Sequence, residues 1–152
     1  MSSDDFEERI VEAVRSTRRA GKIDGWTLHL EALNKGCGDK VALYILLEPD
    51  GKISDIRYEA KGCMLSRASV SLACDAVIGL EIEKAISCAH ILISSVSSAG
   101  RKGEGEESGN SRVEDARSLI ESVRHIPLRL ECALLPWRAL VSHSSVGKDS
   151  AP

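Results

Sequence analysis

The chain is poor in aromatic residues, which make up only 3% of its 152 residues and include a single phenylalanine. Its core must therefore consist mainly of aliphatic side chains, and a hydrophobic fraction of 43% is enough for one globular domain. No apolar run reaches the roughly 18 residues that a membrane span requires. The formal net charge is −3, so the chain has no excess of positive charge to attract nucleic acid or an anionic membrane. We expect neither nucleic acid nor membrane among its partners.

A secretory signal is also missing from the sequence. The first residues are Met-Ser-Ser-Asp-Asp, which is acidic and polar where a signal peptide would be basic and then apolar. We therefore expect a cytoplasmic protein. Its five cysteines are an odd number, and thiols stay reduced in that compartment. This favours metal binding or sulfur chemistry over disulfide bonds.

The order of the expected elements predicts an α+β fold. Alternation and β-branched residues indicate strands at 26–33, 40–47 and 52–60, and Glu-Pro-Asp-Gly at 48–51 predicts a tight turn between the last two. Apolar spacing of three and four residues indicates helices at 4–19, 64–78, 81–94, 113–123 and 133–142. We expect a three-stranded antiparallel meander packed with about five helices. Residues 1–152 would form one domain, with a polar insert at about 94–110 and a flexible tail at 144–152.

Three of the cysteines lie in or beside expected loops. Cys37 sits between two glycines and is followed by Asp39, while Cys63 and Cys132 each precede an expected helix. The positive end of a helix dipole stabilises a thiolate, which is the form that binds metal and attacks sulfur. Three thiolates and one carboxylate would supply the four ligands of a tetrahedral zinc ion. The alternative is that Cys63 and Cys132 are small buried hydrophobic residues, and their spacing alone does not decide between the two.

The other candidates carry weaker signals. Cys74 and Cys88 lie within expected helices and are interpreted as core residues. Trp137 is expected to anchor the last helix against the sheet. His125, seven residues before Cys132, is a weak candidate for a substitute metal ligand.

Three sequence patterns resemble the signatures of one known family. They are Asn-x-x-Cys-Gly-Asp at 34–39, Gly-Cys-x-x-Ser-x-Ala-Ser at 62–69 and Arg-x-x-Cys-Ala-Leu-x-x-Trp-x-Ala-Leu at 129–140. Together they resemble the iron–sulfur scaffold superfamily, which contains IscU, the NifU N-terminal domain and SufU. The resemblance runs from about residue 8 to residue 142 and implies a NifU-like α+β sandwich. The polar segment before Cys132 is most similar to that of the SufU branch. Glu131 departs from the family pattern, because IscU-type proteins carry histidine there and SufU-type proteins usually carry lysine.

The resemblance implies a role in iron–sulfur cluster assembly. One Zn²⁺ would be bound by Cys37, Asp39, Cys63 and Cys132. A pyridoxal-phosphate cysteine desulfurase of the SufS type would donate sulfur as a persulfide, which would pass to downstream assembly machinery or apo-proteins.

Two points of this role stay open. Cys37 is the expected sulfur acceptor because its loop is the most mobile, and Cys132 is the alternative. Arg129 matches a basic position near the family's site. It is either a supporting residue of the site, as Glu131 would be, or a charged side chain in solvent. The alternative function is a scaffold on which a [2Fe–2S] cluster, or iron, is held and passed on.

Overall fold

The computed structural model describes residues 3–16, 18–97 and 111–146. It contains one antiparallel sheet in the order β1-β2-β3, formed by β1 (Leu28–Leu33), β2 (Lys40–Leu47) and β3 (Ile53–Lys61). Leu30 pairs with Leu43 and Leu43 with Tyr58, so neighbouring strands point apolar side chains to the same face. The expected meander and the α+β class are confirmed.

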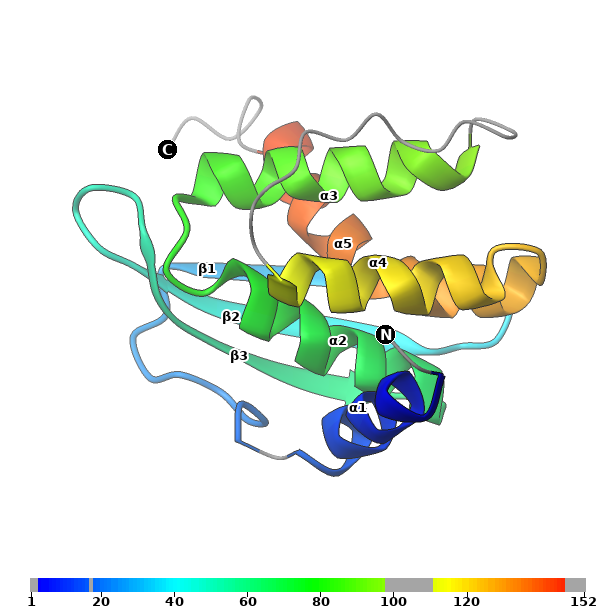
Figure 1. Cartoon of the computed structure of the whole chain (residues 1–152). Helices are drawn as coiled ribbons and strands as arrows, with labels where there is room; N and C mark the ends of the chain where they lie inside the picture. Colours follow the sequence, from blue (N-terminus) through cyan, green and yellow to red (C-terminus); the bar gives the residue numbers. More distant parts are fainter. Residues whose placement is uncertain (1–2, 17, 98–110, 147–152) are drawn as a thin grey trace.

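The turn between β2 and β3 explains why this hairpin could be read from the sequence. Gly51 has a φ of +89°, a conformation that favours glycine, and its N–H donates to the Glu48 carbonyl at 2.8 Å. The turn closes the end of the sheet that lies away from the β1–β2 loop (Figure 1).

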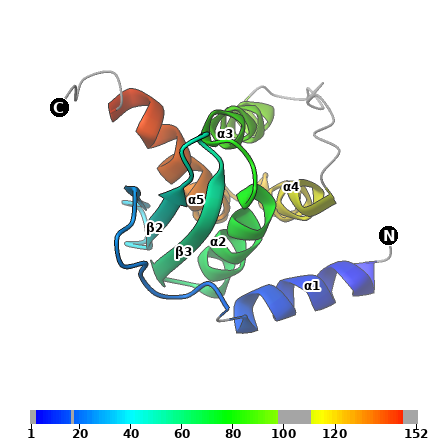
Figure 2. The same cartoon turned by 90° about the vertical axis from the view of Figure 1, so that its left-hand side faces the viewer.

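Five helices are described, and they cover one face of the sheet in two layers (Figures 1 and 2). Their bounds are α1 (Ser3–Arg15), α2 (Met64–Val77), α3 (Ile82–Ser97), α4 (Ser111–Val123) and α5 (Pro127–Val146). The helices α2 and α5 pack directly on the strands, α3 and α4 pack outside them, and α1 lies against α2.

Small residues allow α2 to lie in the centre of the molecule. Ala68, Ala73 and Ala76 are buried, so neighbouring backbones can approach this helix closely. Trp137 of α5 is fully buried and is the largest side chain of the core, as expected for an anchor. Within the described residues its indole N–H has no hydrogen-bond partner.

Several expected boundaries were wrong. The first helix ends at Arg15 instead of residue 19, because Arg19 leaves the helix and its carbonyl accepts the Tyr58 N–H at the open edge of β3. The first strand begins at Leu28 instead of residue 26. Helix α3 continues to Ser97 instead of ending at residue 94, so residues 94–97 are helical. The rest of the expected polar insert, residues 98–110, lies outside the described residues.

The largest difference concerns the last helix. It was expected at 133–142, with Pro127 as a break, but it runs unbroken from Pro127 to Val146. Proline is well suited to the first turn of a helix, where its missing N–H would have no partner. The expected tail therefore starts later than 144, and residues 147–152 lie outside the described residues. None of the described helices is long and apolar enough to cross a membrane.

Replacing Trp137 with alanine tests the contribution of this anchor. We expect Trp137→Ala to lower the free energy of unfolding by about 3–5 kcal/mol, because it leaves a large cavity in a packed core. Trp26 is 46% exposed and gives the matched control. Trp26→Ala should cost less than about 1 kcal/mol in urea unfolding of the metal-free protein. Equal losses in the two variants would show that α5 is not anchored by Trp137.

Candidate metal and sulfur site

Three segments that are distant in sequence meet at one end of the molecule. They are the β1–β2 loop, the junction between β3 and α2, and the first turns of α5, all at the right-hand end in Figure 1. Each segment carries one of the three candidate cysteines. The sheet register and the start of α5 therefore bring Cys37, Cys63 and Cys132 to the same end.

The β1–β2 loop is held in shape by Asn34. Its backbone N–H donates to the Asp39 carbonyl at 2.8 Å, and its carbonyl accepts the Gly38 N–H at 2.7 Å. Its buried side chain accepts the Gly36 N–H at 3.0 Å and donates to the Cys132 sulfur at 3.4 Å. Gly38 has a φ of +79°, so glycine suits the residue after Cys37. Asn34 thus fixes the loop against α5.

Cys37, Asp39 and Cys132 form a compact ligand group. The sulfur atoms of Cys37 and Cys132 are 3.5 Å apart, and Asp39 Oδ2 is 3.4 Å from the Cys132 sulfur. The three potential ligand atoms all lie within 4.8 Å of one another. Two ligands bound to zinc at about 2.0–2.3 Å in a tetrahedron lie about 3.3–3.8 Å apart. The two separations that involve Cys132 therefore match those of a zinc site, and the one between Cys37 and Asp39 is at most 4.8 Å.

Asp39 is the most tightly held member of this group. Its Oδ2 accepts the Ser66 hydroxyl at 2.6 Å and the backbone N–H of Cys63 at 3.2 Å. Burial alone would raise the pKa of this carboxyl, but the hydrogen bonds from Ser66 and Cys63 outweigh it and hold the pKa well below its ordinary value. Asp39 is therefore ionised and available as an oxygen ligand at neutral pH.

Cys63 lies beside the group. It is the exposed N-cap residue of α2, at the helix start where it was expected. Its backbone N–H contacts Asp39, while its sulfur lies 3.6 Å from the Ser66 hydroxyl oxygen. The group of three ligand atoms does not include it. Its assignment as the fourth ligand stays a prediction that requires its side chain to turn toward the other three.

Cys132 does not lie at the start of a helix, as the sequence had suggested. It is five residues into α5 and only 4% exposed. Burial and the neighbouring Cys37 raise the pKa of its thiol above the ordinary value. The helix-dipole argument thus fails for Cys132. In the metal-free protein it is a protonated thiol, and it must lose that proton to become a ligand.

The two residues expected to support the site, Glu131 and Arg129, have different surroundings. Glu131 accepts hydrogen bonds from Nε and Nη2 of Arg138 at 2.9 and 3.0 Å, and it does not belong to the ligand group. Arg129 is exposed, and its side chain makes no hydrogen bond or ion pair with the described residues. Its supporting role stays a prediction.

The other two thiols differ from the three site cysteines. Cys74 is fully buried in the core, and burial raises the pKa of its thiol. Cys88 is partly buried on α3, and burial raises its pKa as well. Both fit the expected core role. His125 is exposed and does not belong to the ligand group.

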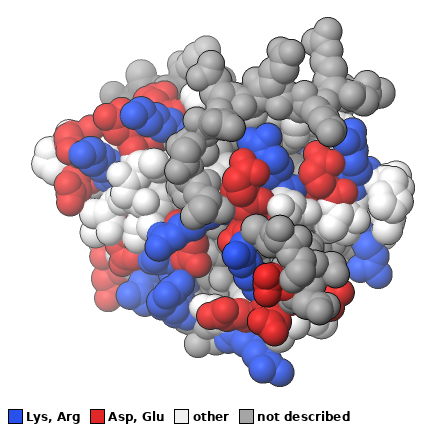
Figure 3. Space-filling model, viewed as in Figure 1, with Lys and Arg blue, Asp and Glu red and all other residues white. Residues whose placement is uncertain are grey.

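Exposed apolar side chains accompany the site. Among the described residues, four of the six exposed large hydrophobic side chains lie in the three segments that carry the cysteines or directly beside them in the chain. We call these four the apolar rim: Leu33, Met64, Ile126 and Leu128. Leu128 lies against the β1–β2 loop, since a Cβ added to Gly36 would be 2.9 Å from its Cδ1. By contrast, the face in Figure 3 mixes acidic and basic side chains.

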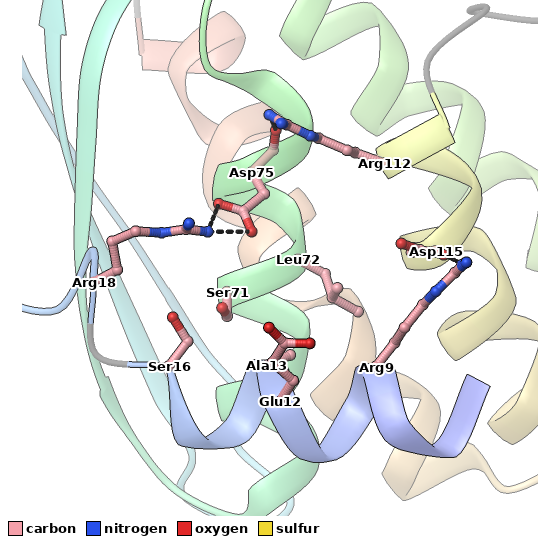
Figure 4. Close-up of a pocket in the computed structure, with 10 residues that line it drawn as sticks. All are labelled: Arg9, Glu12, Ala13, Ser16, Arg18, Ser71, Leu72, Asp75, Arg112 and Asp115. Atoms are coloured by element: carbon pink, nitrogen blue, oxygen red, sulfur yellow. Dashed lines mark hydrogen bonds and ion pairs between the residues drawn. The ribbon is translucent and has the colours of Figure 1, made fainter. Parts of the chain in front are cut away.

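A polar hollow of about 360 Å³ lies elsewhere, between α1, α2 and α4 (Figure 4). Two of its three arginines pair with acids: Arg9 with Asp115 at 2.6 Å, and Arg18 with Asp75 at 3.2 Å. The third, Arg112, donates to the backbone carbonyl of Asp75 at 3.3 Å. No cysteine lines it. These ion pairs join α1 to α4 and the segment after α1 to α2, and the hollow is separate from the candidate site.

Sequence reasoning missed three residues of the site. Asn34, Gly62 and Ser66 were noted as parts of sequence patterns, but no contact was assigned to them. A Cβ on Gly62 would lie only 2.4 Å from Asp39 Cγ, so the glycine makes room for the carboxylate. In the sequence, each of these three residues is marked only by its spacing from a cysteine. That spacing does not show which side-chain atoms are in contact.

Comparisons with known proteins show the family and the fold of this chain. Residues 5–120 match the family model described as the NifU-like N terminal domain. The chain is 30% identical over 135 residues to the iron–sulfur cluster assembly scaffold protein IscU of Thermotoga maritima, covering 89% of each chain. It is 27% identical to the zinc-dependent sulfurtransferase SufU of Bacillus subtilis, covering 89% of this chain and 86% of that protein. A crystal structure of a NifU-like N-terminal protein from Brucella abortus superposes with a TM-score of 0.77 at 26% identity, covering 97% and 98% of the two chains.

Filling the space beside Asp39 tests the ligand group. We expect Gly62→Ala to weaken zinc binding about 10-fold or more, because the new methyl displaces a carboxylate ligand. Gly51→Ala is the matched control: its φ is also positive and its Cβ would meet nothing within 4 Å. It should lose stability but keep the zinc affinity, measured by competition with a chelator. Unchanged affinity in Gly62→Ala would remove Asp39 from the ligand set.

Proposed function

Because the chain belongs to the family of NifU-like N-terminal domains, we propose that it is a zinc-binding sulfur acceptor in iron–sulfur cluster assembly. The observation that carries the proposal is the exposed Cys37 thiol beside the buried Cys132 and Asp39. One thiol can be reached by another protein, while the other two groups are fixed in the interior. That division suits a site that holds a metal and also receives sulfur.

The ligand set is Cys37, Asp39, Cys132 and, after a side-chain rotation, Cys63. Zinc would keep the thiols of this set deprotonated while they are bound. Asp39 is the hard ligand among soft ones, and its charge is already shared with two hydrogen-bond donors. It is therefore the weakest of the four ligands.

Cys37 is the acceptor in this proposal. Its sulfur attacks the outer sulfur of a cysteine persulfide on the desulfurase and forms a new S–S bond. The bond between that outer sulfur and the desulfurase cysteine breaks, and the desulfurase cysteine leaves as a thiolate. No electrons are gained or lost overall. Cys132, which was the alternative acceptor, is 4% exposed and has no comparable access.

The desulfurase would dock on the apolar rim. An exposed apolar patch beside a reactive group is typical of an interaction surface. Leu128 lies against the loop that carries Cys37, and Met64 directly follows Cys63 in the chain. Burying the rim would also exclude water during transfer. A SufS-like pyridoxal-phosphate desulfurase is the partner we propose, and cluster-assembly proteins or apo-proteins would take the sulfur onward.

A [2Fe–2S] scaffold is the second candidate function. The Thermotoga maritima relative is named as a scaffold, and thiolates bind iron–sulfur clusters as well as zinc. Two features favour the zinc-binding acceptor. The Bacillus subtilis relative is named zinc-dependent, and the residue before Cys132 is a glutamate held by Arg138, so no imidazole lies there.

Removing the acceptor thiol tests the proposal. We expect Cys37→Ser to keep the fold and to lose sulfur uptake from a desulfurase by at least about 100-fold, because a hydroxyl is a far weaker nucleophile toward sulfur. Persulfide formation is measured by alkylation and mass spectrometry of the intact chain. Cys88→Ser, at a thiol outside the site, is the control and should take up sulfur normally. Normal uptake by Cys37→Ser would contradict the assignment.

A charge on the apolar rim tests the docking surface. We expect Leu128→Glu to weaken desulfurase binding about 10-fold or more, since it places a charge in a contact that loses water. Zinc content should not change. Val11→Glu on α1 is the control, because Val11 is also exposed, at 44%, but lies in another segment. If both variants bind the desulfurase equally well, the rim is not the docking surface.

A further inference from the structure

We propose that Ser66 is a positioning residue of the metal site and acts through Asp39. The inference rests on the proposed function insofar as it concerns a bound zinc ion. Ser66 holds the Asp39 carboxylate toward the sulfur atoms of Cys37 and Cys132, both with and without bound metal.

The contacts of Ser66 lead to this assignment. Its side chain is 0% exposed, on the first turn of α2, and its hydroxyl donates to Asp39 Oδ2 at 2.6 Å. A hydroxyl has one hydrogen, so the contact of 3.6 Å with the Cys63 sulfur has the thiol as donor. A chain of hydrogen bonds thus runs from Cys63 through Ser66 to Asp39.

Only some of the donors to Asp39 can remain when metal binds. Cys132 also donates to Oδ2, at 3.4 Å, but it gives up its proton on becoming a ligand. The hydroxyl of Ser66 and the backbone N–H of Cys63 keep their protons. Because Ser66 is fully buried, bulk water does not compete for its hydroxyl. Ser66 is therefore the side chain that keeps the carboxylate oriented in both states.

The position of Ser66 also links Cys63 to the other ligands. Within the described residues, it is the side chain that contacts both the Asp39 carboxylate and the Cys63 sulfur. When the Cys63 sulfur turns toward the metal, it gives up its contact with the Ser66 oxygen. Asp39 keeps its hydrogen bond during this rotation, so the site can gain or lose its fourth ligand without disturbing the first three.

The competing explanation is that Ser66 only fastens α2 to the loop. Ser69 provides the comparison, because it lies one turn further along α2 and is 2% exposed. Its hydroxyl donates to the Ala133 carbonyl of α5 and contacts no candidate ligand side chain. A buried serine of purely structural value is therefore available in the same helix.

The test compares Ser66→Ala with Ser69→Ala. We expect Ser66→Ala to lower the zinc affinity about 10- to 100-fold, as is usual when a partner of a metal ligand is removed. The visible spectrum of the Co²⁺-loaded protein should change, because its intensity depends on the arrangement of the ligands. Ser69→Ala should destabilise the fold, yet keep the affinity within about 2-fold and leave the spectrum unchanged.

A second comparison shows whether Ser66 acts through Asp39. In an Asp39→Ala background the three thiols remain, and the Ser66→Ala change should no longer alter the affinity. Equal affinities for wild type and Ser66→Ala, with zinc bound by both, would overturn this inference but leave the proposed function intact. A wild-type protein that takes up no zinc would overturn both.

Discussion

The buried carboxylate of Asp39 is the contact on which the arrangement of this site depends. It joins the β1–β2 loop to the start of α2 through Ser66 and the Cys63 N–H, and it faces the Cys132 sulfur. An ion that is removed from water in this way is stable only if donors surround it, and here they do. Gly62 leaves space for it, so the backbone approaches the carboxylate closely. The same group therefore organises the fold and offers an oxygen ligand.

The three site cysteines have different surroundings, and this gives each a different part in the proposed chemistry. Cys132 is buried and held by Asn34, so it serves as a fixed ligand. Cys37 is exposed beside a glycine with positive φ, so it can meet a partner. Cys63 lies at the start of α2, and its side chain would have to rotate to join the ligand group. A metal bound by two fixed ligands and two movable ones is held firmly but can still exchange a ligand.

Much of this could be predicted from the sequence because the signals were local. The hairpin followed from alternation and a Pro-Asp-Gly turn, and Cys63 was placed correctly because the preceding glycine breaks the strand. Local signals failed at Pro127, which was interpreted as a break but starts α5 and so places Cys132 inside the helix. The bond from Ser66 to Asp39 joins residues from two distant segments. No periodicity could reveal it, because only the folded chain brings them together.

The most direct test of the account is zinc K-edge X-ray absorption of the protein isolated without oxygen. If the proposed ligand set is correct, we expect one zinc per chain with three sulfur neighbours at about 2.3 Å and one oxygen neighbour at about 2.0–2.2 Å. That result would show that the Cys63 sulfur turns to complete the group formed by Cys37, Asp39 and Cys132. A zinc ion with two sulfur neighbours, or a folded protein that contains no zinc, would contradict it.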